Sequence, residues 1–152
     1  MAEELFVLSE ASAFRLMRED DHRFVMNSWL KSHDEFKGKI GKPFYDVHAP
    51  IVNRLLACSS VKLVACDPSD PDLIQAWIVA DLLPDGTSVV HYMYTKDVFR
   101  RLGIAHGLFQ AATTRAKNVV CSHDCRIYSS VKSRHAEEVQ LSYDPNAINV
   151  RV

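Results

Sequence analysis

The residues whose types and spacing could do chemistry begin at Arg100, in the run RRLGIAHGLF. The first turn of a helix has backbone N–H groups without intrahelical partners, and the helix dipole adds partial positive charge there. Gly103 lacks the Cβ that would keep an anion away, Ala105 keeps the next contact small, and Arg100 and Arg101 add charge for phosphate oxygens. The run therefore favours binding of a pyrophosphate, with a solvated basic helix start as the alternative.

Two common phosphate-binding motifs are absent from the sequence. The chain has no GxxxxGK[ST] loop and no GxGxxG fingerprint. Any phosphate site at Arg100 must therefore belong to another class of strand–loop–helix unit.

Composition limits the kinds of protein that this chain can be. It has 152 residues, which suits one domain over 1–152, and 47% hydrophobic residues, which suffice for a core. A net charge of −1 gives no general basic field for nucleic acid or a membrane surface. We find no signal region and no apolar run long enough to span a bilayer, so we expect a soluble intracellular protein.

The cysteine pattern does not predict a metal site. Cys121, His123 and Cys125 are close in sequence, but they are three candidate ligands without a CxxC pair. We expect reduced thiols in a turn and a strand and no bound metal, since a disulfide is uncommon in a reducing compartment.

Hydrophobic periodicity predicts the elements that must position the Arg100 run. Strands are expected at 12–18, 61–67, 73–81, 88–95, 126–131 and 147–152, and helices at 20–36, 46–58, 103–118 and 133–141. Asp20 or Asp21 can cap the first helix, and Pro50 disturbs the first turn of the second. Turns are expected at 67–72 and at LPDG, which makes the three central strands an antiparallel meander.

This order of elements predicts an α/β (α+β) fold in three layers, with a mixed, mostly antiparallel sheet flanked by helices. The Arg100 run then follows the third strand of the meander directly. A strand that leads into a glycine-containing loop and a helix is a suitable geometry for an anion site.

The run MYTKDVFRRLGIAHGLF resembles the acetyl-CoA-binding motif of the GCN5-related N-acetyltransferases (GNAT family). In that family a strand is followed by a [Q/R]-x-x-G-x-[G/A] loop and a helix, and Arg100, Gly103 and Ala105 match its three fixed positions. Met93 and Thr95 fall where the family has strand residues. Arg101 and Asp97 depart from the family's common glycine and proline. The predicted element order matches the family across most of the chain.

The resemblance implies acetyl-CoA as co-substrate and a direct attack by an amine on its thioester in a ternary complex. Backbone amides of 101–106 would hold the pyrophosphate. Strand 91–95 would separate from its neighbour and hydrogen-bond the pantetheine, with the thioester near the point of separation. The residues implied in coenzyme binding are Tyr94, Thr95, Arg100, Arg101, Leu102, Gly103, Ile104, Ala105 and His106.

The resemblance also implies a base and an acid for proton transfer. His91 lies where many family members have a glutamate base, and a histidine ordinarily titrates near neutrality. Asp81 is the second candidate base. Tyr143 is the candidate acid, with Tyr128 and Ser130 as alternatives, although the family's Y-x-x-x-G-F ending is missing. Each of these residues has a plain structural alternative as a packing, capping or turn residue.

The resemblance places the acceptor amine over the first two helices and their loop. Trp29 and Phe36 in this segment are more typical of a core than of a pocket, and Asp34 and Glu35 are either surface charges or an attraction for a cationic amine. The sequence names no acceptor, which could be a small molecule or a protein.

A non-catalytic module of the same fold is the alternative hypothesis, supported by the missing C-terminal signature. NSWLKS and FRRLGIA also resemble short phage-encoded proteins of this type, which implies the host cytoplasm or a virion. The β-branched strand at 147–152 could pair in a homodimer.

Overall fold

The computed structural model describes residues 5–37, 42–122 and 140–143, with side chains at 5–32 and 46–122. The elements, in chain order, are β1 (Phe6–Ser9), β2 (Ser12–Leu16), the 3₁₀ turn η1 (Glu19–Asp21), α1 (His22–Lys37), α2 (Lys42–Cys58), β3 (Val61–Asp67), β4 (Asp70–Leu82), β5 (Thr87–Thr95), η2 (Asp97–Phe99), α3 (Ile104–Thr113), β6 (Asn118–Cys121) and β7 (Gln140–Tyr143).

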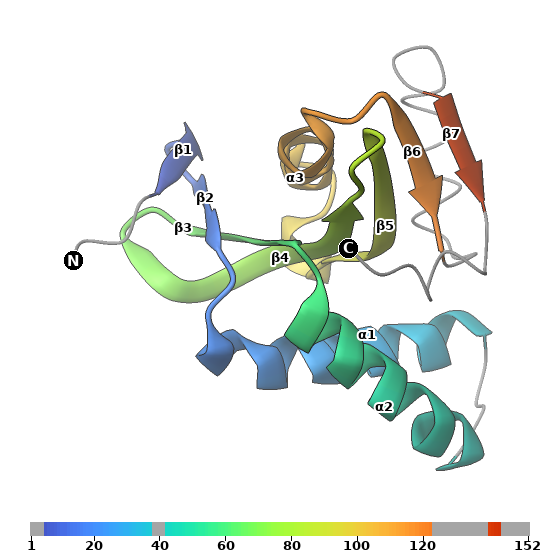
Figure 1. Cartoon of the computed structure of the whole chain (residues 1–152). Coiled ribbons are helices and arrows are strands. Elements are labelled where there is room, and N and C mark those ends of the chain that lie inside the picture. Colours follow the sequence, from blue (N-terminus) through green and yellow to red (C-terminus); the bar gives the residue numbers. More distant parts are fainter. Residues whose placement is uncertain (1–4, 38–41, 123–139, 144–152) are drawn as a thin grey trace.

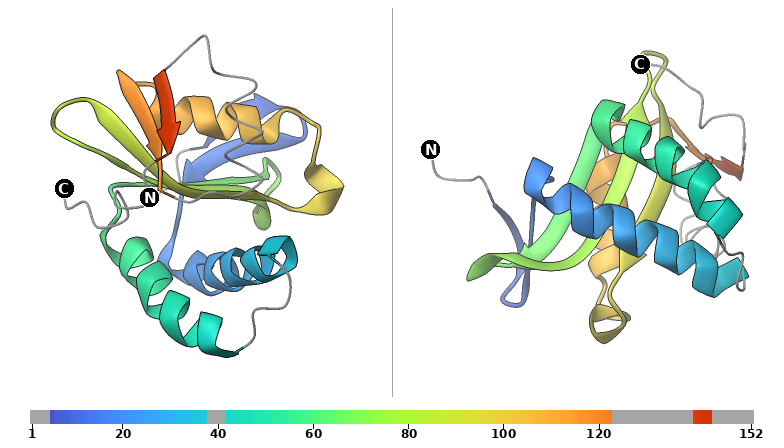
Figure 2. Two further views of the ribbon diagram at one scale, coloured as in Figure 1. Left: turned by 90° about the vertical axis from the view of Figure 1, so that its right-hand side faces the viewer. Right: turned by 90° about the horizontal axis from the view of Figure 1, so that it is seen from below.

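One seven-stranded sheet runs through the chain in the order β1-β2-β3-β4-β5-β6-β7. The first five strands pair antiparallel, whereas β6 is parallel to β5 and β7 is parallel to β6. Helix α3 covers one face of the sheet, and α1 and α2 cover the other (Figures 1 and 2). The predicted three-layer fold with a mixed, mostly antiparallel sheet is confirmed.

Each face of the sheet has its own apolar core. On the α3 face, Ile104, Leu108 and Phe109 pack over Ile78 and Val90. Both layers bury one side of β4 and β5, so the residues of these strands alternate between the two cores. The strands that carry the candidate site are therefore held between two packed layers.

An aromatic cluster fills the core on the α1 and α2 face. Trp29 from α1 lies 5.3 Å from both Trp77 of β4 and Tyr92 of β5, measured between ring centroids. The indole N–H of Trp77 donates to Ser28 Oγ at 2.9 Å, so this buried donor is satisfied. Trp29 is fully buried, which confirms its expected place in the core.

A buried ion pair fixes the start of α1 to the sheet. Arg15 of β2 donates two hydrogen bonds to the Asp21 carboxylate, at 2.6 and 3.1 Å, and two more to the carbonyl of Pro71. Burial raises the pKa of Asp21, but hydrogen bonds from Arg15 and from the Arg18 N–H outweigh it and leave the pKa below its ordinary value. Asp21 thus anchors η1 to β2, which is a different role from the predicted helix cap.

Several predicted boundaries were wrong. Strand β1 was not predicted, because all four of its residues are exposed and the strand shows no alternation. The predicted turn 67–72 shrinks to two residues, since β4 already begins at Asp70. Helix α2 begins at Lys42, so Pro50 lies inside it and not in its first turn.

The predicted helix 103–118 ends early, at Thr113. The hydroxyls of Thr113 and Thr114 donate back to carbonyls one turn earlier, and the Lys117 N–H then donates to the Gly86 carbonyl at 2.7 Å. This contact with the β4–β5 turn brings the chain into register for β6, which the sequence did not predict.

Residues 140 and 141, assigned by sequence to a helix, lie instead in β7. The predicted strands 126–131 and 147–152, Tyr128, Ser130, His123 and Cys125 lie outside the described residues. Cys121 is buried in β6, and the described part of the chain contains no cluster of potential metal ligands. No helix within the described ranges is long and apolar enough to cross a membrane.

Candidate functional site

The loop after β5 carries two consecutive features that depend on its backbone. Arg101 has a φ of 65° and Gly103 a φ of 80°, both in the left-handed region. Arg100 donates from Nε to the Thr95 carbonyl at 3.0 Å and forms an ion pair with Asp97. Arg100 therefore holds the loop closed on itself, while the Arg101 side chain is exposed.

Helix α3 starts at this loop without a side-chain cap. Its first intrahelical bond runs from the Gly107 N–H to the Gly103 carbonyl at 3.0 Å, so the amides of 104–106 precede the helical ladder. A Cβ added to Gly103 would meet no atom within 4 Å. Glycine is needed here for its positive φ, and the space in front of the helix start is open.

The packing behind this helix start is close. Ile104 is buried against the sheet, and Ala105 packs at the edge of the same core. A Cβ on Gly107 would come within 2.9 Å of Phe14 Cζ. These contacts hold the first turn of α3 near β2 and fix the direction of its amides.

Strands β5 and β6 form a fork. They pair only from Thr87↔Asn118 to Val90↔Cys121, and the last ladder bond runs from the Ser122 N–H to the Val90 carbonyl at 3.1 Å. In the described part of the chain, β5 then continues to Thr95 beside β4 alone.

A bulge lies where the fork opens. Val79 pairs with Tyr92 and Ala80 with Val90, which leaves His91 as the extra residue in β5. Beyond the bulge the Lys96 N–H donates to the Gln75 carbonyl. Because backbone groups alternate along a strand, those of Met93 and Thr95 face away from β4, toward the side of β6. The Thr95 carbonyl accepts from Arg100 on that side.

The imidazole of His91 joins two strands in a buried hydrogen-bonded chain. Its Nε2 lies 2.9 Å from Asp81 Oδ2 in β4, and its Nδ1 lies 2.9 Å from Ser122 Oγ after β6. Ser122 and the two predicted base candidates are each less than 5% exposed. The structure thus brings Asp81 and His91 together as one unit and adds Ser122.

The Asp81 carboxylate is held on three sides. Besides His91 it accepts from the Ser60 N–H at 2.7 Å and from Ser59 Oγ at 3.2 Å. Burial raises the pKa of Asp81, but the hydrogen bonds from His91, Ser60 and Ser59 outweigh it and leave the pKa below its ordinary value. Asp81 is therefore a carboxylate near neutral pH.

The remaining predicted residues lie apart from this chain. Tyr94 is half-buried beside Trp77, with ring centroids 6.1 Å apart. Leu102 and His106 lie in the loop and the first turn of α3, and Tyr143 lies in β7, where its backbone pairs with Cys121. The side chains of Phe36, Asp34 and Glu35 lie outside the described residues.

Sequence reasoning missed Ser122, which is an ordinary serine in the CSHDC stretch. Asp81 and His91 could be paired from the predicted hairpin, because strands 73–81 and 88–95 place them diagonally opposite each other. The position of Ser122 depends on the parallel register of β6, which no local pattern indicates.

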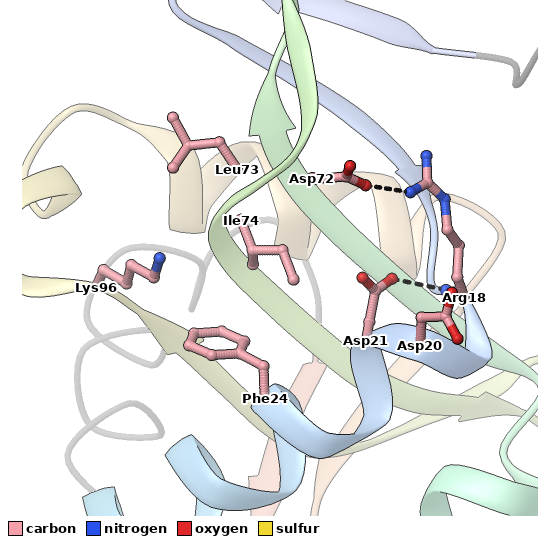
Figure 3. A pocket seen from close by; sticks show the side chains of 8 residues that line it. All are labelled: Arg18, Asp20, Asp21, Phe24, Asp72, Leu73, Ile74 and Lys96. Atoms are coloured by element: carbon pink, nitrogen blue, oxygen red, sulfur yellow. Dashed lines mark hydrogen bonds and ion pairs between the residues drawn. The ribbon is translucent and has the colours of Figure 1, made fainter.

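A pocket of ≈ 320 Å³ lies at the start of α1 (Figure 3). It is lined by Arg18, Asp20, Asp21, Phe24, Asp72, Leu73, Ile74 and Lys96. Its charges are largely engaged: Arg18 pairs with Asp72 at 2.6 Å, and Lys96 lies over the Phe24 ring at 4.9 Å. None of the residues implicated by sequence lines this pocket.

No model of a known protein family matches the sequence, and no curated protein matches it either. Solved structures do match. A GNAT family acetyltransferase from Staphylococcus aureus superposes with a TM-score of 0.61 at 14% identity, over 83% of this chain and 82% of that chain. The chain has the GNAT fold.

Two further structures with the GNAT fold were solved with a coenzyme. A GNAT family acetyltransferase from Brucella melitensis, in complex with acetyl-CoA, has a TM-score of 0.55 at 15% identity, over 80% of this chain and 82% of that one. An N-acetyltransferase from Thermoplasma acidophilum, in complex with coenzyme A, has a TM-score of 0.51 at 12% identity, over 68% and 70%. At such identities the likeness concerns the fold.

Proposed function

We propose that this chain is an acetyl-CoA-dependent N-acetyltransferase that transfers the acetyl group to a primary amine. The observation that carries the proposal is a strand, β5, that parts from β6 after Val90 and leads directly into the uncapped, glycine-initiated helix α3. The fork offers backbone groups to an extended chain, and the helix start offers amides to a pyrophosphate. GNAT-fold structures solved with acetyl-CoA or coenzyme A support the same reading.

The loop fits a pyrophosphate. Amides of 104–106 precede the helical ladder, and no atom lies within 4 Å of where a Gly103 Cβ would be. Arg101 is exposed and adds positive charge, whereas Arg100 shapes the loop through Thr95 and Asp97. Positive charge and open amides at one helix start are what phosphate oxygens require.

The fork fits the pantetheine arm. Backbone groups of Met93 and Thr95 face the side of β6 beyond its last pairing residue, so they can bond the amides of an extended ligand. Thr95 Oγ1 is buried and has no hydrogen-bond partner among the described residues. A buried hydroxyl without a partner is uncommon, and a ligand group would satisfy it.

When bound, acetyl-CoA supplies an activated thioester carbonyl. The chain's part is to hold the two substrates together and to move a proton away from the attacking nitrogen. We assign the proton acceptor to His91, with Asp81 as the carboxylate that orients the imidazole and stabilises its protonated form. Tyr143 as the acid stays a prediction.

A non-catalytic module of the same fold is the alternative. The deep burial of His91, both of whose ring nitrogens are engaged, is the observation that favours it. The phage-type origin, the location in a host cytoplasm or a virion, and a homodimer or protein target stay predictions.

Titration calorimetry with acetyl-CoA tests the binding half of the proposal. We expect wild-type protein to bind in the micromolar range. Gly103→Gln and Gly103→Glu share the strain of a side chain at positive φ and differ in charge. We expect Gly103→Glu to bind at least about tenfold more weakly than Gly103→Gln, since about 1.4 kcal/mol of charge repulsion corresponds to that factor. No heat and no thermal shift for the wild type would refute the proposal.

A further inference from the structure

Ser122 lies where the sheet divides. Its N–H makes the last bond of the β5–β6 ladder, to Val90, and its Oγ lies 2.9 Å from His91 Nδ1. Neither the sequence motif nor the comparisons give this serine a role. It occupies the end of the His91 hydrogen-bonded chain that is nearest to the fork.

The direction of each hydrogen bond in this chain can be assigned. Asp81 is a carboxylate and can only accept, so His91 Nε2 must carry the proton and donate it to Oδ2. In a neutral imidazole the other nitrogen, Nδ1, is then an acceptor, and the Ser122 hydroxyl donates to it. A hydroxyl that donates its proton still has lone pairs with which to accept another.

The far end of the chain is closed. Ser59 Oγ and the Ser60 N–H both donate to the Asp81 carboxylate. Within the described residues, Asp81 from β4 and Ser122 after β6 are the only hydrogen-bond or ion-pair partners of the His91 imidazole. A proton that enters or leaves His91 by a short path must therefore pass through Ser122.

We propose that Ser122 is the proton relay of the acetyl transfer, linking the attacking amine to His91; this rests on the proposed function. As the amide C–N bond forms and the thioester C–S bond breaks, Ser122 Oγ accepts a proton from the amine nitrogen and passes its own to His91 Nδ1. Asp81 stabilises the resulting imidazolium. His91 then returns the proton through Ser122 to the departing thiolate, so no net proton is gained or lost.

Three variants separate a relay from a structural role. Ser122→Ala removes the hydroxyl at the fork, and Ser122→Thr keeps it. Ser59→Ala is the matched control, because it removes a buried hydroxyl from the same network on the closed side of Asp81. For each protein we would measure acetyl-CoA affinity by calorimetry and amine-dependent release of coenzyme A. The probes are a polyamine, an arylalkylamine and a lysine-containing peptide.

We expect Ser122→Ala to lower kcat about 100-fold, the lower range for loss of acid–base catalysis, while acetyl-CoA affinity changes less than about twofold. Ser122→Thr should retain most of the rate, and Ser59→Ala should stay within about threefold of wild type. Ring ¹⁵N NMR of the ligand-free protein should show His91 protonated at Nε2, with an Nδ1 resonance that moves in Ser122→Ala.

Opposite outcomes are distinguishable. Unchanged turnover in Ser122→Ala, or a His91 protonated at Nδ1 in the wild type, overturns the relay and leaves the proposed function standing. A wild-type protein that binds no acetyl-CoA, or binds it and acetylates none of the probes, overturns the proposed function and the relay with it.

Discussion

Replacing Asp81 with asparagine should destabilise the protein and reverse the proton on His91. The amide oxygen can keep the bond from the Ser60 N–H, but the amide nitrogen must stand where Oδ2 now accepts from His91 Nε2 at 2.9 Å. Two donors cannot share that contact. The imidazole must therefore give up its Nε2 proton and carry it on Nδ1, where it can donate to Ser122 Oγ.

The magnitude follows from the bonds that change. The variant loses a buried charge-assisted bond between a carboxylate and an imidazole, and the bond to Ser60 loses its charge. Since a hydrogen bond to a charged group contributes about 1.5–3 kcal/mol, we expect Asp81→Asn to lower the free energy of unfolding by about 2–3 kcal/mol. Asp72→Asn is the control: its carboxylate pairs with Arg18 but is 84% exposed, so its loss should cost less than about 1 kcal/mol.

The effect depends on pH in a defined direction. The pKa of Asp81 is lowered in the folded protein from its ordinary value of 3.8. Its contribution to stability is therefore complete above the unfolded-state pKa, and it is lost as pH falls through the folded pKa. The stability difference between wild type and Asp81→Asn should be constant near neutral pH and shrink from about pH 4 downward.

Urea unfolding measures the stability change, and ring ¹⁵N NMR measures the tautomer. A loss below about 0.5 kcal/mol would be typical of a surface substitution and not of a buried network. Such a small loss, together with an Nε2-protonated His91 in the variant, would refute the assigned directions of the hydrogen bonds.

Other parts of the fold give three further predictions, each measured by urea unfolding. Arg15→Ala should lower the free energy of unfolding by about 3–5 kcal/mol, because it leaves the buried Asp21 carboxylate without its partner. Gly107→Ala should cost about 1 kcal/mol, since a Cβ 2.9 Å from Phe14 Cζ outweighs the better helix propensity of alanine. Adding Phe14→Leu should remove that penalty, and a purely additive double variant would contradict the steric argument. Pro50→Ala should stabilise α2 by about 1–3 kcal/mol, because the proline lies inside the helix; equal stability would show a compensated kink.

The central strands could be predicted because local chemistry determines them. Residues 61–67 are β-branched and end at Pro68, and the predicted strand matches β3 at both ends. The loop at Arg100 and the start of α3 could also be predicted, because Gly103 follows the meander directly. Both depend on residues that are adjacent in the chain.

The parts that could not be predicted depend on contacts between distant residues. Strand β1 pairs with β2 at the edge of the sheet while keeping its side chains exposed, so it has no hydrophobic alternation. Strand β6 depends on the Lys117 contact with Gly86, and the bulge at His91 depends on how β5 pairs with β4. The bulge sets which backbone groups face the fork, and no pattern within 88–95 indicates it.

The same limit applied to the candidate site. His91 and Asp81 were each proposed as a separate base, and the structure joins them in one hydrogen-bonded unit. Ser122, which completes the unit, comes from a third strand and 31 residues further along the chain than His91.

The measurement that tests the central claim most directly is transfer of a ¹³C-labelled acetyl group from acetyl-CoA to the probe amines, followed by mass spectrometry. We expect the labelled amide to accumulate with wild-type protein in step with free coenzyme A, and to be lost with Gly103→Glu. A rate of labelled product no higher with wild type than with Gly103→Glu or without protein would contradict the claim that this fold, in this chain, transfers an acetyl group.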